Sequence, residues 1–220
     1  MNKKKTYRFT SGEDIPPVPG SPEEEVAILQ YLDELKPQPK DRADYLEITN
    51  NRIYFYSGVE TKNVLGLNKT IRELSAEIQH SAAVLECPPA SIFLHVNSHG
   101  GDLFSGLAAM DEIRKSKTPI ISIVDGCAAS AATLMTIAAD KRQINKHAYM
   151  LIHQLSSGMW GKYTEMKDEM ENVDNMMKTI REIYLEYTKL PKKKLDEILE
   201  HDLWFDAKTC LKYGLVDEII

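Results

Sequence analysis

Alternation of short apolar runs with amphipathic segments is the feature that most constrains the fold of this chain. Runs rich in β-branched and aromatic residues at 52–58, 91–96 and 120–124 predict strands. Between and after them, apolar residues recur every three or four positions, which predicts helices over about 64–78, 103–113 and 130–139. Near-continuous apolar strands joined by helices require a parallel sheet covered on both faces. The sequence therefore predicts an α/β fold.

Composition narrows the class of protein. The chain has 220 residues, 43% of them hydrophobic, which suits one main domain. Its net charge of −6 argues against nucleic acid as the main partner. No apolar stretch reaches the length of about 18 residues that spans a membrane, and no signal peptide follows the N-terminal methionine, so we expect a cytoplasmic protein with no membrane partner. The three scattered cysteines predict neither a disulfide framework nor a metal site.

The N-terminal region differs from the rest of the chain. Six of the 10 prolines fall within the first 39 residues, which rules out continuous regular structure there. The segment 21–24 has the form of a capping box, and apolar residues follow at helical spacing to about residue 36. We therefore predict a proline-rich arm over 1–45 with one short helix, followed by the main domain over 46–220.

A long amphipathic helix is predicted over 162–189. Apolar residues at alternating spacings of three and four form its stripe: Tyr163, Met166, Met170, Val173, Met177, Ile180, Tyr184 and Tyr187. At 1.5 Å per residue such a helix is about 40 Å long, more than a small sheet needs for cover. A projecting, methionine-rich stripe needs a partner, and a second copy of the chain is the favoured one. A helix folded back on its own core is the alternative.

A candidate nucleophile follows the strand at 120–124. The chain runs through Gly126 and several small residues to Ser130, where the next helix is predicted to begin. That position places the serine hydroxyl at the positive end of a helix dipole, with the amide of Ala131 free to stabilise an oxyanion. The alternative is that Ser130 only caps a buried helix.

A second turn of this kind follows the strand at 91–96. Gly100 and Gly101 close the segment 97–101, and paired glycines let a backbone expose amide groups at the start of the next helix. The amide of Gly101 is the second candidate oxyanion donor. A phosphate-binding turn is the competing interpretation, but neither GxxxxGK[ST] nor GxGxxG occurs here.

A nucleophilic serine needs a base, and His153 is the best placed of the six histidines because it ends the apolar run 148–152. His99, in the glycine turn, is the reserve. A zinc site built from His95 and His99 fails on strand geometry. A Ser-Lys pair using Lys141 would leave His153 without a role. The orienting acid stays open among three aspartates of the C-terminal segment: Asp196, Asp202 and Asp206.

Four motifs in order carry a resemblance to a known family. They are NSHGG at 97–101, GCAASA at 126–131, MLIHQ at 150–154 and AKTCLKYGLVD at 207–217. Together they resemble the proteolytic subunit of the Clp protease, the ClpP family, over about residues 50–220. The resemblance implies a Ser-His-Asp triad of Ser130, His153 and Asp202, with the Gly101 and Ala131 amides as oxyanion donors. It implies no metal or cofactor and the following substrate-binding residues: Gly100, Leu103, Gln154, Leu155 and Ser156.

The resemblance also implies an architecture and an activity. We expect a ClpP/crotonase-like fold of repeated ββα units with a projecting handle at about 154–189. Two stacked heptameric rings would form a tetradecamer, and an AAA+ unfoldase would consume the ATP while feeding unfolded protein or peptide to a serine endopeptidase. A catalytically weak or inactive ring subunit is the alternative, motivated by the altered segment 154–161 and a shortened loop before Asp202. A crotonase-type enzyme acting on acyl-CoA is the third hypothesis.

Overall fold

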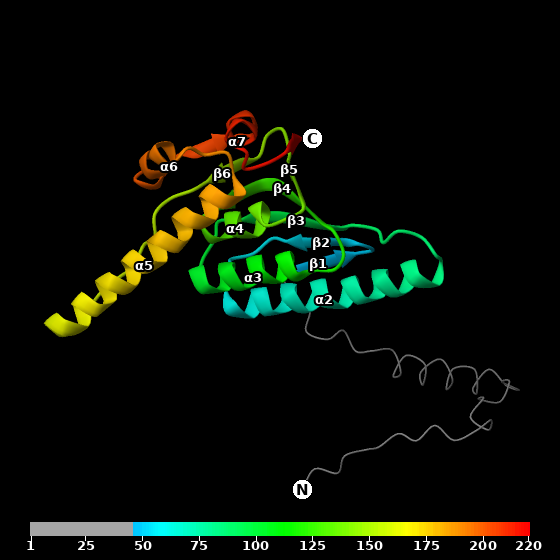
Figure 1. Cartoon of the computed structure of the whole chain (residues 1–220), viewed down its shortest axis with the longest axis horizontal. Coiled ribbons are helices and arrows are strands. Elements are labelled where there is room, and N and C mark those ends of the chain that lie inside the picture. The colour runs from blue at the N-terminus through cyan, green and yellow to red at the C-terminus, as the bar shows by residue number, and fades with distance from the viewer. Residues whose placement is uncertain (1–45) are drawn as a thin grey trace, which may run out of the picture. The chain divides into compact units, whose positions relative to one another are not determined.

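The computed structural model describes residues 46–220, and Figure 1 shows the arrangement of their helices and strands. The predicted arm 1–45, with its short helix, lies outside the described residues. Within the described part of the chain, no helix combines the length and the apolar character needed to cross a membrane.

One mixed sheet forms the centre of the described region. Its strands are β1 (Leu46–Thr49), β2 (Arg52–Phe55), β3 (Ile92–Ser98), β4 (Ile120–Ala129), β5 (Lys141–Ile144), β6 (Tyr149–Leu151), β7 (Trp204–Asp206) and β8 (Glu218–Ile219). The main path runs β1-β2-β3-β4-β5-β8, with β6 and β7 branching from β4. Among the strand pairs of residues 46–220, only β1–β2 and β6–β7 are antiparallel. The predicted α/β class is confirmed.

The helices cover the sheet and, in one case, extend beyond it. They are α2 (Thr61–Val84), α3 (Leu103–Lys115), α4 (Ala131–Ile137), α5 (Tyr163–Tyr187), α6 (Lys192–Leu199) and α7 (Ala207–Tyr213). In Figure 1, α2 and α3 lie side by side along the sheet. Apolar residues from these helices and from β2, β3 and β4 form the core, among them Phe55, Leu67, Leu94, Met110 and Val124.

Strand β4 is longer than predicted and changes partner along its length. Its first part, 121–124, pairs with β5, and its last part, 127–129, pairs with β6. Gly126 lies at the change of partner, where an added Cβ would come within 2.7 Å of the Asn97 Oδ1 atom. Because β4 continues to Ala129, α4 begins at Ala131, one residue later than the helix predicted over 130–139. The fork places the end of β4 beside the end of β6.

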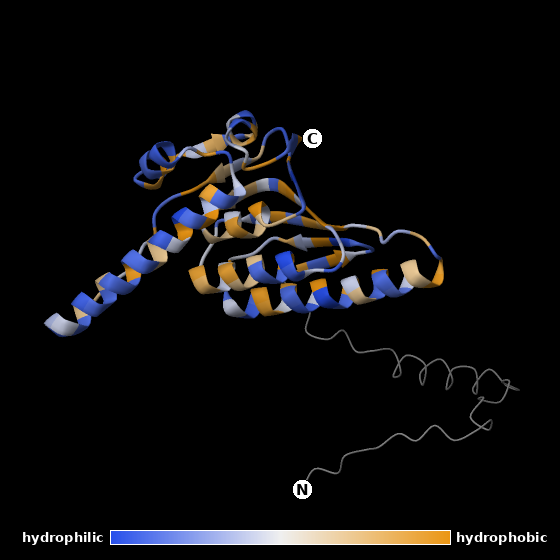
Figure 2. Cartoon of the chain, viewed as in Figure 1, coloured by the Kyte–Doolittle hydropathy of each residue, from blue (hydrophilic) through white to orange (hydrophobic). Residues whose placement is uncertain are grey.

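The apolar stripe of α5 packs partly on the core of its own chain and is partly exposed, so each of the two expectations holds for one end of the helix. Near its C-terminal end, Met177, Ile180 and Tyr184 are buried in the core of the same chain. Near its N-terminal end, Tyr163 and Met170 are exposed, and Figure 1 shows this end extending away from the sheet. Hydrophilic residues dominate α5 in Figure 2, with apolar positions between them. Part of the helix therefore folds on its own core, and the rest projects as predicted.

Candidate active site

Ser130 lies in a strained turn between β4 and α4. Its φ of 53° is in the left-handed region, which a residue other than glycine rarely adopts. Hydrogen bonds hold the turn: the Ser130 amide donates to the Leu151 carbonyl at 2.9 Å, and Thr133 donates to the Ser130 carbonyl. Such strain persists where the surrounding structure fixes the backbone, and it is commonest at functional sites.

The glycine turn of 97–101 packs directly against this serine. Gly100 has a φ of +91°, and a Cβ added there would lie 2.5 Å from the Ala129 carbonyl oxygen and 2.8 Å from the Ser130 Cβ. Gly101 bridges Val59 in parallel, with the flanking Gly100 carbonyl and Asp102 amide bonding to Val59. In this pattern the N–H of Gly101 points away from Val59. Gly101 also lines the cavity that Ser130 borders, so this N–H is a candidate donor there.

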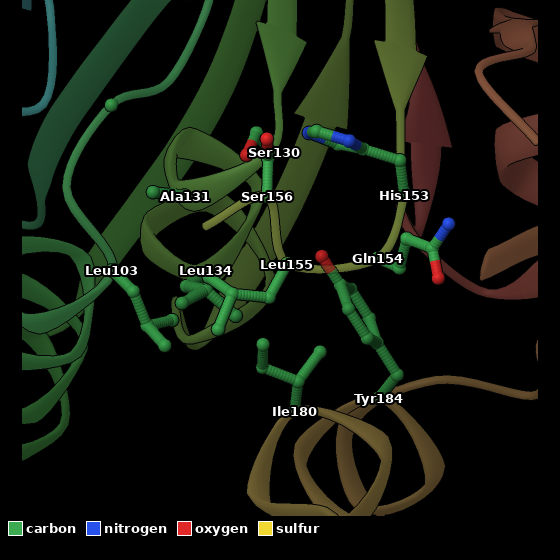
Figure 3. A pocket seen from close by; sticks show the side chains of 11 residues that line it. Leu103, Ser130, Ala131, Leu134, His153, Gln154, Leu155, Ser156, Ile180 and Tyr184 are labelled. Atoms are coloured by element: carbon green, nitrogen blue, oxygen red, sulfur yellow. The ribbon is translucent and has the colours of Figure 1, made fainter. Parts of the chain in front are cut away.

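A small pocket of about 100 Å³ gathers most of the predicted site residues (Figure 3). Its lining comprises Gly101, Leu103, Ser130, Ala131, Leu134, His153, Gln154, Leu155, Ser156, Ile180 and Tyr184. Gly100 lies behind Ser130 and does not line the pocket. The Ala131 amide, in the first turn of α4, has no partner within its own helix. Two backbone amides therefore border the same space as the serine and the histidine.

Sequence reasoning did not place Leu134, Ile180 or Tyr184 in the site. Ile180 and Tyr184 belong to the apolar stripe of the predicted long helix, which indicated burial but not the residues they would contact. The structure packs the buried end of α5 under the pocket, as Figure 3 shows. The pocket therefore has an apolar floor supplied by a helix distant in sequence.

The pairing of β6 with β7 brings His153 to Asp202. Leu151 is paired with Trp204 in the antiparallel register. Two residues after Leu151 is His153, and two residues before Trp204 is Asp202, so continuing the register places them opposite each other. The His153 Nδ1 atom lies 3.3 Å from the Asp202 Oδ1 atom. With Nδ1 on the carboxylate side, Nε2 is left for another partner, and Figure 3 shows the ring extending toward Ser130.

The other two candidate aspartates have different contacts. Asp196 forms an ion pair with Arg181 at 3.0 Å. Asp206 accepts a hydrogen bond from the Thr209 amide at the start of α7, and its bonds with Thr209 hold the pKa of this carboxyl below its usual range. Of the three aspartates left open by the sequence, the structure brings only Asp202 to His153.

The reserve residues lie outside the pocket. His99 packs edge-on to Trp204 at 6.0 Å between ring centroids. Lys141 pairs with Glu218 at the other edge of the sheet. His95 hydrogen-bonds Asp125 through Nδ1 at 2.9 Å. His95, His99 and Lys141 therefore do not line the pocket that contains Ser130, whereas His153 does.

Comparison with known proteins identifies the family. The model of the Clp protease family matches residues 50–220. The ATP-dependent Clp protease proteolytic subunit 2 of Treponema denticola is 31% identical over 165 residues, covering 73% of this chain and 82% of the relative. The subunit of the same name from Treponema pallidum is 31% identical over 172 residues, covering 76% and 86%.

A solved structure supports the same fold. A point mutant of ClpP1 from Listeria monocytogenes superposes with a TM-score of 0.65 at 22% identity, over 75% of this chain and 88% of that one. The predicted ClpP-like fold is thereby confirmed. With a family model that spans most of its length and relatives aligned over most of theirs, the chain belongs to the Clp protease family.

Proposed function

We propose that this protein is a serine endopeptidase with Ser130 as nucleophile, His153 as general base and Asp202 as the acid that orients His153. The observation that carries the proposal is the single pocket that holds Ser130, His153 and the Gly101 and Ala131 amides, with Asp202 on the far side of the imidazole. A nucleophile, a base, an orienting group and two oxyanion donors are the parts that acyl transfer needs.

The reaction follows from these positions. The Ser130 Oγ attacks the peptide carbonyl while the His153 Nε2 accepts its proton, and the Gly101 and Ala131 amides stabilise the oxyanion. His153 then gives the proton to the leaving amine, which breaks the peptide bond and leaves an acyl group on Ser130. Water, activated by the same imidazole, hydrolyses that ester and regenerates the serine. Asp202 holds the imidazole with Nδ1 protonated throughout.

We place the substrate along the rim of the pocket. Gln154, Leu155 and Ser156 follow His153 in a segment that belongs to no helix or strand, and we propose that a substrate peptide pairs with it as an added strand. Leu103 bounds the opposite side, and Gly100 contributes from outside the pocket lining, where it packs against Ser130. An apolar substrate side chain would enter toward Leu134 and Ile180, which form part of the pocket. The reaction itself requires no cofactor or metal.

The assembly we propose is that of the family resemblance: two stacked heptameric rings, a tetradecamer fed with peptide or unfolded protein by an AAA+ unfoldase that alone consumes ATP. The exposed apolar residues toward the free end of α5, Tyr163, Met166 and Met170, support a contact between copies, because such a stripe is unfavourable in water.

We further propose a cytoplasmic location, no nucleic-acid or membrane partner, and an organisation of an arm over 1–45, a protease domain over 46–220 and a handle at about 154–189.

Ser130→Ala tests the catalytic proposal. In the full-length protein, we expect kcat for a fluorogenic peptide to fall by at least about 10³-fold, because the acyl-enzyme forms on the Ser130 hydroxyl. Ser81→Ala, on α2 and outside the pocket, is the matched control and should retain wild-type kcat. Size-exclusion chromatography should give the same elution for all three proteins. Peptide cleavage by Ser130→Ala at the wild-type rate would overturn the proposal.

A further inference from the structure

A buried chain of hydroxyl groups joins α5 to the carbonyl of Ser130. The Thr133 hydroxyl donates to the Ser130 carbonyl oxygen at 2.6 Å, and the Thr133 amide donates to the same oxygen at 2.9 Å. The Tyr184 hydroxyl forms a hydrogen bond with the Thr133 hydroxyl oxygen. A threonine hydroxyl has one hydrogen, and here the carbonyl receives it, so Tyr184 is the donor in the second bond.

The Ser130 carbonyl belongs to the same peptide unit as the Ala131 amide. A trans peptide unit is planar, and its C=O and N–H point in opposite directions. Fixing the direction of the carbonyl therefore fixes the direction of the N–H. The two bonds from Thr133 thus determine where the Ala131 N–H points, and that N–H is one of the two proposed oxyanion donors.

Tyr184 is suited to hold Thr133 in this arrangement. Its side chain is 2% exposed and Thr133 is fully buried, so water does not compete for either hydroxyl. Burial raises the pKa of Tyr184 to about 12, which keeps the phenol a neutral donor across the working pH range. Figure 3 shows the Tyr184 ring rising from α5 beneath the pocket. The residue comes from the buried end of the helix whose other end projects.

We infer that the Tyr184 hydroxyl is a positioning group for the oxyanion hole: through Thr133 it sets the peptide plane that carries the Ala131 amide. The inference rests on the proposed function. If Tyr184 positions Thr133, the packing of α5 against α4 affects how well the oxyanion hole stabilises the transition state. Tyr184 also lines the pocket, but its hydroxyl donates its one hydrogen to Thr133.

Tyr184→Phe tests the inference, because it keeps the ring and removes only the hydroxyl. We expect kcat per active site to fall about three- to tenfold, the scale of one lost hydrogen bond, while KM for the peptide stays within about twofold. The rate at which a fluorophosphonate labels Ser130 should fall by the same factor, because the phosphoryl oxygen uses the same two amides. Tyr187→Phe, on the same helix and outside the pocket, is the matched control and should leave all three values unchanged.

Thr133 variants separate positioning from packing. Thr133→Val removes the hydroxyl with little change in shape and should lower kcat at least as much as Tyr184→Phe, whereas Thr133→Ser should restore most of it. The double variant Tyr184→Phe/Thr133→Val should be no slower than Thr133→Val alone, because both changes break one chain of bonds. If Tyr184→Phe fails to fold, as judged by its melting curve, the Val and Ser variants of Thr133 decide the question.

Each outcome separates this inference from the proposed function. A kcat for Tyr184→Phe within twofold of Tyr187→Phe, or a loss confined to KM, overturns the inference and leaves Ser130 as nucleophile intact. Equal kcat values for Thr133→Val and Thr133→Ser overturn it as well. A wild-type protein that forms no adduct at Ser130 overturns the proposed function, and the positioning inference fails with it.

Discussion

The two ends of the proposed site are built in different ways. At the nucleophile end, Ser130 lies between β4 and α4, where its backbone is bonded to Leu151 and Thr133 and packed against Gly100. At the acid end, the Asp202 side chain is 79% exposed and meets His153 at 3.3 Å on the edge of the molecule. The first end is fixed by the core of the chain, whereas the second depends on one exposed contact.

The packing of the core fixes the position of Ser130, whereas solvent or a neighbouring subunit can change the contact between His153 and Asp202. Exposed ion pairs contribute about 0–1 kcal/mol, so the His153–Asp202 contact is weakly held by itself. Two backbone contacts hold the loop that carries Asp202. At its start the Gln154 amide donates to the Leu199 carbonyl, and at its end β7 pairs with β6. We therefore expect changes at the nucleophile end to affect both folding and catalysis, and changes at the acid end to affect catalysis alone.

The largest effect is expected from Gly100→Ala. The added Cβ meets the Ala129 carbonyl oxygen at 2.5 Å in a backbone conformation with φ +91°, so the turn under Ser130 must shift. We expect a loss of about 2 kcal/mol or more in the free energy of unfolding, measured in urea, together with loss of detectable peptide cleavage.

Gly66→Ala is the matched control for that change. Gly66 lies inside α2, and among residues 46–220 the one atom that an added Cβ would meet is a Leu46 methyl group at 4.0 Å. The control should gain about 0.5–1 kcal/mol and keep its activity. Gly100→Ala with wild-type stability and kcat would show that the nucleophile end is not rigid, which removes the contrast between the two ends.

Asp202→Asn should have an intermediate effect that is confined to catalysis. The asparagine side chain can no longer stabilise the imidazolium, so we expect kcat to fall about 10- to 100-fold. This loss is smaller than the roughly 10⁴-fold of a buried triad aspartate because Asp202 is exposed, and smaller than that of Ser130→Ala because the nucleophile and the base remain. The free energy of unfolding should change by less than about 0.5 kcal/mol, since the carboxylate is exposed. Asp196→Asn, which breaks the pair with Arg181, is the control and should leave kcat unchanged. A kcat for Asp202→Asn equal to that of the control would remove Asp202 from the triad.

The smallest effect is expected at the opposite edge of the sheet, where Asp217 pairs with Arg142. The hydrogen bond from Arg142 holds the pKa of Asp217 below its usual range. A carboxyl whose pKa is lower in the folded state stabilises the fold above its unfolded pKa, and this stability is lost as the pH falls through the folded pKa. Because the pair is partly exposed, Asp217→Asn should cost about 0.5–1 kcal/mol at pH 7.

This stability difference should shrink as the pH falls below the usual aspartate range, with peptide cleavage at pH 7 changed by less than twofold. Urea unfolding of both proteins between pH 3 and 7 measures it. A difference that is constant across this range would show that the charge of Asp217 is not what stabilises the pair.

Much of the fold follows from local patterns. The strands β2, β3 and β4 and the long helix are predicted because a periodicity of two or of three and four residues, or a short apolar run, is a property of neighbouring positions, independent of distant contacts. The turn at Ser130 is predicted for the same reason: a buried strand, a glycine and small residues occur in one stretch. The branch of β6 and β7 from β4 is not predicted, because the change of partner along β4 depends on where 149–151 and 204–206 meet.

The proposed acid and the proposed positioning residues have roles that local sequence patterns do not reveal. Asp196, Asp202 and Asp206 lie in one short segment, and only the register of β6 with β7 places Asp202 opposite His153. Tyr184 reads from the sequence as one more apolar position of a stripe. Its hydroxyl bond to Thr133, 51 positions away, requires the packing of α5 on α4. Side chains whose roles depend on such tertiary contacts have no signal in spacing.

Intact-mass spectrometry of the full-length protein after exposure to a fluorophosphonate is the most direct test of Ser130 as an activated nucleophile. In the wild type we expect one adduct per subunit, located by peptide mapping at Ser130. In Asp202→Asn an adduct of the same mass should form more slowly, and in Ser130→Ala none should form. A wild-type protein that stays unmodified under conditions that label a control serine protease, or an adduct that persists in Ser130→Ala, would contradict the assignment of this pocket as a serine peptidase site.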